Sequence, residues 1–175
     1  MRYSNAVVVY ILVAGLHDAA LTPGAPSDPE RISHVSQQTE PVVTRARGTF
    51  EVQITPMATD AYTDATTLGR MTIDKQYSGD LVGTGKGQML TGMGTVKGSG
   101  AYAAIERVTG TMAGRHGSFV LQHAGVMTRG AQSLVITIVP DSGTEGFVGI
   151  SGTCTIIIEG KQHSYDLEYT LPAAP

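Results

Sequence analysis

Apolar and polar residues alternate with a period of two along most of the chain beyond residue 46, and the alternating runs are separated by turn residues. No segment there shows a long apolar stripe at helical spacing, so the pattern predicts an all-β domain. Because the connections are short, successive strands are expected to be antiparallel neighbours. The predicted strands cover residues 47–55, 67–77, 81–96, 101–114, 117–128, 133–140, 147–158 and 161–171. Eight such strands predict a closed antiparallel β-barrel, with an open two-sheet sandwich as the alternative.

The turn positions predict which side chains share a face, since opposed residues on paired strands point the same way. With Arg115-His116 as a two-residue turn, Val108 lies opposite His123, and Glu106 is a diagonal neighbour of His123. The same counting on the two adjacent hairpins extends this apolar face, and independent counting on the last hairpin, with Ile158 opposite Lys161, gives a further apolar face. We expect these faces to point inward. The expected inward residues include Met89, Thr91, Met93, Tyr102, Glu106, Phe119, Leu121, His123, Ile136 and Ile138, and from the last hairpin Cys154, Ile156, His163 and Tyr165.

The facing of residues 68–77 stays open between two alternatives. A two-residue turn at Gly79-Asp80 places the even-numbered residues inside, namely Arg70, Thr72, Asp74 and Gln76. Apolarity instead places Met71, Ile73, Lys75 and Tyr77 inside, and a bulge among the glycines at 83, 85 and 87 would allow this facing.

A carboxylate and an imidazole on an apolar inner face are candidate functional groups. Burial penalises the charged form of Glu106, so we expect its pKa to be raised, and Glu106 is the candidate catalytic residue. The candidate ligand-binding residues are Tyr102, Glu106, His123, Cys154 and Tyr165, because small-molecule sites are apolar with a few convergent polar groups. The alternatives are that His123 only satisfies Glu106, and that the tyrosines and the cysteine are ordinary core residues.

Composition excludes several classes of protein. Among the 175 residues, 12 are Lys or Arg and 15 are Asp or Glu, and this net charge of −3 argues against a nucleic-acid binder. The single cysteine excludes a disulfide framework and a cysteine zinc site. The five histidines contain no close pair, so we expect no metal site and no cofactor.

Residues 1–45 predict an N-terminal extension ahead of a barrel domain at residues 46–172. The apolar run at 6–16 is too short to span a membrane but suits a signal-peptide core. No good cleavage site follows, which favours a cytoplasmic location over export. Residues 22–44 are rich in Pro, Ser, Thr and charge, which is typical of a linker.

Four segments resemble a bacterial family of unknown function, DUF3224: GRMTIDKQYSGDL at 69–81, YAAIERVTGTMAGRHGSFVLQHAGVMTRGA at 102–131, IVPDSGT at 138–144 and KQHSYDLEYTL at 161–171. The resemblance covers about residues 46–172. Members of this family resemble allene oxide cyclase in fold, so the resemblance implies an eight-stranded antiparallel barrel. It implies no established activity, because fold does not fix function.

Three functional hypotheses follow. The first is a barrel that binds a small apolar molecule, and the second is a cofactor-independent cyclase or isomerase that uses Glu106. The third is a structural or oligomerisation module with a filled barrel. A homo-oligomer is expected because the outer face of the fourth and fifth strands is rich in small residues, namely Ala101, Ala103, Ala113 and Ala124. An interior cavity of at least roughly 300 Å³ would favour the first two hypotheses.

Overall fold

The computed structural model describes residues 42–58 and 68–172. The expected signal-like run and nearly all of the expected linker lie outside the described residues. Within the described ranges every regular element is a strand, and no helix is present that could cross a membrane. The strands are β1 (Thr44–Pro56), β2 (Leu68–Gly79), β3 (Leu81–Met93), β4 (Gly100–Met112), β5 (Arg115–Thr128), β6 (Ala131–Ile138), β7 (Thr144–Glu145), β8 (Ser151–Glu159) and β9 (Gln162–Thr170).

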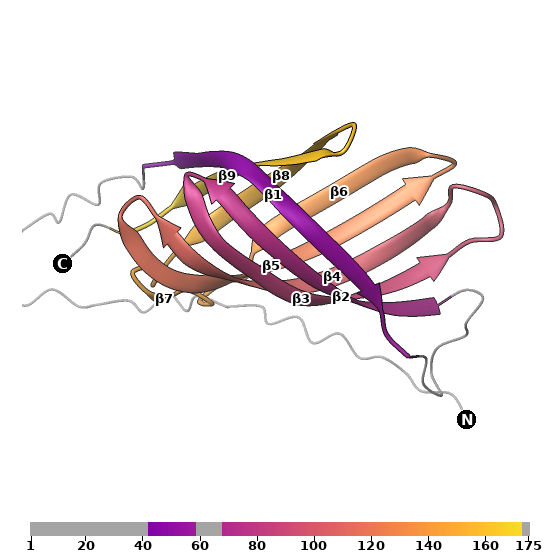
Figure 1. Cartoon of the computed structure of the whole chain (residues 1–175), viewed down its shortest axis with the longest axis horizontal. Coiled ribbons are helices and arrows are strands. Elements are labelled where there is room, and N and C mark those ends of the chain that lie inside the picture. Colours follow the sequence, from indigo (N-terminus) through magenta and orange to yellow (C-terminus); the bar gives the residue numbers. More distant parts are fainter. Residues whose placement is uncertain (1–41, 59–67, 173–175) are drawn as a thin grey trace, which may run out of the picture. The chain divides into compact units, whose positions relative to one another are not determined.

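Eight of these strands form a closed antiparallel barrel (Figure 1). Neighbours in the chain pair with each other, and the ring closes because β1 pairs with β9 as well as with β2. The short β7 is an extra strand that pairs with β5. The seam between β6 and β8 is the weakest, with the single residue pair Thr137–Thr153. The predicted barrel is therefore confirmed, and the open sandwich is excluded.

The turn between β4 and β5 differs from the prediction, but the facing of the two strands does not. The turn residues are Ala113 and Gly114, which have φ angles of 52° and 73°, and Met112 pairs with Arg115. The expected turn at Arg115-His116 is wrong by two residues. This error changes the partner of each residue by four positions, which is an even number, so each side chain keeps its predicted face. Ala113 lies in the turn and not on the outer face of β4.

The odd-numbered residues of β2 face the interior, as the apolar pattern of Met71, Ile73 and Tyr77 favoured. Pairing with β3 runs continuously from Tyr77–Gly83 to Leu68–Gly92, so no bulge is needed. Five residues separate Tyr77 from Gly83, an odd number, whereas a two-residue turn requires an even one. Ile73, Lys75 and Tyr77 are consequently buried.

One end of the barrel is packed solid. β8 begins at Ser151 rather than at residue 147, because the chain first turns and places Phe147 in the core. The ring of Phe147 packs edge-on against Phe119, with 5.6 Å between the ring centroids. Tyr165 also lies at this end, where its hydroxyl oxygen accepts a hydrogen bond of 2.9 Å from the backbone N–H of Leu81. Other buried side chains at this closed end are Met112, Ile150, Leu167 and Tyr169.

Candidate functional site

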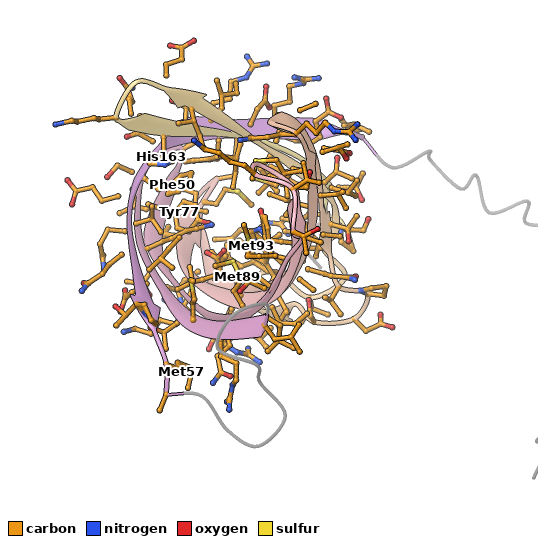
Figure 2. The ribbon with its side chains drawn as sticks, turned by 90° about the vertical axis from the view of Figure 1, so that its right-hand side faces the viewer. Phe50, Met57, Tyr77, Met89, Met93 and His163 are labelled. Carbon is orange, nitrogen blue, oxygen red and sulfur yellow. The ribbon has the colours of Figure 1, made fainter. Side chains whose placement is uncertain are left out.

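The other half of the barrel contains a cavity of about 400 Å³. Every strand of the eight-stranded ring contributes to its wall, which is mostly apolar. Figure 2 shows the view into this end, with Met89 and Met93 inside the ring of strands. The size and the lining are those of a typical small-molecule site. Polar side chains in the wall include Lys75, Thr91, Tyr102, His123 and His163.

A charged cluster surrounds the carboxylate of Glu106, which is fully buried. Lys75, itself only 5% exposed, donates a hydrogen bond of 2.7 Å from Nζ to Oε2 of Glu106. The hydroxyl of Tyr77 donates a 2.8 Å hydrogen bond to the other carboxylate oxygen and accepts one of 3.2 Å from Lys75. Each carboxylate oxygen therefore has a donor, as a buried charge requires.

Glycines on β3 make room for this carboxylate. Gly87 pairs with Glu106 directly, and a Cβ atom on Gly85 would overlap Oε1 of Glu106. With Gly83, these residues form an inward-facing stripe of glycines at alternate positions of one regular strand. Gly85 is thus explained by the side chains of Glu106 and Tyr77, whereas Cβ atoms on Gly83 and Gly87 would meet the backbone of β4.

The pKa of Glu106 moves in the opposite direction to the one expected from burial. Burial alone raises this pKa, but the contacts with His123, Lys75 and Tyr77 together lower it below its ordinary value. The expectation of a raised pKa is wrong because it left out the lysine and the tyrosine of β2. Glu106 is therefore a carboxylate at neutral pH, not a ready proton donor.

His123 lies beside Glu106, as the diagonal pairing predicted. It pairs with Ala104, two positions along β4 from Glu106, and its Nε2 lies 3.1 Å from Oε2 of the carboxylate. This contact is within ion-pair distance, but it lacks the geometry of a hydrogen bond, so the buried Nε2 has no hydrogen-bond partner. The residue is 3% exposed, and it lines the cavity.

The other predicted ligand-binding residues are divided between the cavity and the core. Tyr102 lines the cavity and lies against Gly125, and burial raises the pKa of its hydroxyl. Cys154 packs against the core cluster, and burial is the main cause that raises the pKa of its thiol to about 12. Tyr165 belongs to the closed end. The structure therefore brings Tyr102, Glu106 and His123 to one region, whereas Cys154 and Tyr165 are not in the cavity wall.

Lys75 is the functional candidate that the sequence reasoning did not single out. Lys75 belongs to the odd-numbered set with Met71, Ile73 and Tyr77, and this set was one of the two alternatives considered for the inward face of the strand. A charged residue at an apolar position, opposite a strand that places glycine at every second position, was the available signal.

The polar groups near the cavity are suited to hydrogen bonding and to charge stabilisation. Within residues 42–58 and 68–172, no three His, Cys, Asp or Glu side chains are grouped closely enough to hold a metal ion. Lys75 and His123 are the cluster members that line the cavity, whereas Glu106 and Tyr77 hold Lys75 in place from behind the wall.

A model of the protein family of unknown function DUF3224 matches residues 46–169. The chain belongs to this family. A DUF3224 protein of unknown function from Shewanella oneidensis MR-1, known from a crystal structure, is 42% identical in sequence, with a TM-score of 0.70. The match covers 76% of this chain and 100% of that one. A comparison with curated proteins gave no match. The DUF3224 barrel is consistent with the expected likeness to allene oxide cyclase in fold, and the family description names no activity.

Proposed function

We propose that this DUF3224 barrel binds a small apolar molecule in its interior. The observation that carries the proposal is the cavity of about 400 Å³, with apolar walls and a buried charged cluster beside it. Burying apolar surface contributes roughly 25 cal/mol per Å², so the methionines and aliphatic residues of the wall favour an apolar ligand. A filled structural barrel would leave no such space.

Catalysis by a cyclase or isomerase is the second hypothesis, and less supports it. Glu106 is hydrogen-bonded on both oxygens, its pKa is lowered, and it does not line the cavity. If Glu106 acts as the catalytic acid or base, then the Glu106→Gln variant loses turnover while it retains the ligand.

The binding hypothesis is tested with an uncharged fluorescent dye, 1-N-phenylnaphthylamine, and two matched variants. Met89→Trp adds volume inside the cavity, whereas Val82→Trp adds the same indole to an exposed, outward position on the same strand. We expect wild type and Val82→Trp to bind the dye equally, and Met89→Trp to bind it at least about tenfold more weakly. Equal binding by all three proteins would contradict an interior site.

We also propose that the outer face of β3–β6 contacts a second copy of the chain. Adjacent strands there place Leu90 beside Ala103, Ala103 beside Ala124, and Ala124 beside Val135. The small alanines permit close packing. The larger apolar side chains on this outer face are exposed: Leu90, Ile105, Val126 and Val135.

A further inference from the structure

Two nitrogen atoms of the charged cluster retain hydrogen-bonding capacity beside the cavity. The ammonium of Lys75 has three N–H groups, and the structure gives them two acceptors, Oε2 of Glu106 and the hydroxyl oxygen of Tyr77. Nε2 of His123 is buried without a hydrogen bond. A buried polar group left without a partner is destabilising, so a hydrogen bond to an oxygen atom of a ligand would relieve this cost.

The two nitrogens are close enough to be met by one polar group. Both contact the same atom, Oε2 of Glu106, at 2.7 Å for Lys75 and 3.1 Å for His123. The position of the lysine is fixed further by Phe50, because its Nζ lies 4.7 Å from the centroid of that ring. The hydrogen-bonding position is therefore preorganised by the protein.

The charges of the cluster favour an uncharged ligand. The ammonium of Lys75 is already compensated by the carboxylate of Glu106. Among the residues that line the described cavity, Lys75 is the only lysine, arginine, aspartate or glutamate. A ligand carboxylate would therefore enter an apolar cavity with no uncompensated cation to meet it, which is costly.

We infer that the ligand is an apolar molecule that presents one uncharged oxygen, a hydroxyl or a carbonyl, to His123 and Lys75. This inference rests on the proposed binding function and names the chemical class of the ligand. The hydroxyl or carbonyl oxygen of the ligand accepts a hydrogen bond from the free N–H of Lys75, and Nε2 of His123 forms a second hydrogen bond with the same group. The apolar body lies along the methionine-rich wall toward Met89 and Met93.

The test compares four eight-carbon probes as competitors of 1-N-phenylnaphthylamine at pH 7: octan-1-ol, octan-2-one, octanoate and octane. Their apolar bodies are similar, so the ranking reports on the polar group. We expect the alcohol and the ketone to compete at least about tenfold better than octanoate. This ranking needs only the wild-type protein, so it remains informative if a variant fails to fold.

Two variants then assign the preference to the cluster. His123→Leu should weaken the binding of octan-1-ol by about three- to tenfold, which corresponds to the loss of one hydrogen bond. It should change the binding of octane by less than about twofold. His116→Leu, an exposed histidine on the same strand, is the control and should change neither probe.

Octanoate competing as well as the alcohol would overturn the inference, and so would an equal effect of His123→Leu on octane and octan-1-ol. Both results leave the binding function intact, because the dye still binds. Failure of the wild-type protein to bind the dye or any of the probes would overturn the binding function itself.

Discussion

The carboxylate of Glu106 accepts hydrogen bonds from a lysine and a tyrosine that are both on β2. Breaking a buried ion pair by removing one partner leaves an uncompensated charge, at a cost of about 3–5 kcal/mol. At the scale of single residues, the stability of the barrel therefore depends on the polar cluster as well as on apolar packing.

Glu106→Gln should lower the free energy of unfolding by about 3–5 kcal/mol at pH 7, because it leaves the ammonium of Lys75 buried without its counter-charge. The measurement is urea denaturation. Glu51→Gln, an exposed position on β1, is the control and should change stability by less than about 0.5 kcal/mol. If Glu106→Gln is as stable as wild type, the ion pair between Glu106 and Lys75 does not stabilise the fold.

Wild type and Glu106→Gln should differ less in their free energy of unfolding at acidic pH. The pKa of Glu106 is lower in the folded state than its unfolded value of about 4.3, so its contribution is fully present above that pH. The contribution is lost as the pH falls through the folded pKa. The stability difference between wild type and Glu106→Gln should therefore be constant from pH 7 to about pH 5 and shrink toward pH 2. A constant difference over the whole range would contradict the lowered pKa.

Gly85→Ala should destabilise the protein by about 1–3 kcal/mol, because its Cβ atom would displace the carboxylate of Glu106. Gly92→Ala on the same strand is the matched control, since its Cβ atom would make only an ordinary contact of 3.6 Å with Leu68. The control should be neutral or slightly stabilising, because alanine restricts the unfolded chain. Thermal unfolding of the two variants compares them, and equal midpoints would refute the steric role of Gly85.

At the scale of strands, alternation predicted the inner faces better than it predicted the turns. The inner positions of β4 and β5 were right although their turn was misplaced, because an even change in partner number preserves facing. The facing of β2 could not be derived by counting, because the length of its connection to β3 is odd. Lys75 was missed for this reason, and the lowered pKa of Glu106 was missed with it.

The segment around β7 was predicted only as a connection, because its sequence contains mainly turn residues. The burial of Phe147 depends on a distant glycine: a Cβ atom on Gly117 would lie 3.0 Å from the Phe147 ring. Such a contact between separate segments has no signal in the local pattern of either one.

Phe147→Ala should destabilise the barrel by about 3–5 kcal/mol, because Phe147 is fully buried at the closed end. The exposed neighbour Val148→Ala is the control and should change stability by less than about 0.5 kcal/mol. Urea denaturation gives both values. The folded Phe147→Ala protein should still bind the dye, because Phe147 does not line the cavity. Loss of dye binding without loss of stability would contradict this division of the barrel.

At the scale of the whole barrel, one half is packed and the other half is hollow. The packed half provides the core, and the hollow half contains the cavity in which we propose that a ligand binds. The sequence predicted the barrel and its inner face, but not this division. The division depends on side-chain volumes across non-adjacent strands, such as the methionines and glycines that leave the cavity and the aromatic rings that fill the other end.

Self-association also belongs to this scale. We expect light scattering at micromolar concentrations to give a mass above that of one chain, because the outer face of β3–β6 exposes large apolar side chains on each of these four adjacent strands. Ile105→Glu should shift the protein to monomers, whereas Val148→Glu, also exposed but elsewhere, should not. A monomeric wild-type protein would contradict the proposed interface.

Methyl resonances of methionine test the interior binding site most directly. The side chains of Met71, Met89, Met93 and Met127 line the cavity, whereas Met112 is buried in the closed end and Met57 lies outside the ring of strands (Figure 2). Titration of ¹³C-methyl-methionine protein with octan-1-ol should shift the four cavity resonances with one common affinity and leave Met57 and Met112 nearly unchanged. Unchanged cavity resonances at saturating alcohol, or shifts confined to Met57 and Met112, would contradict binding inside the barrel.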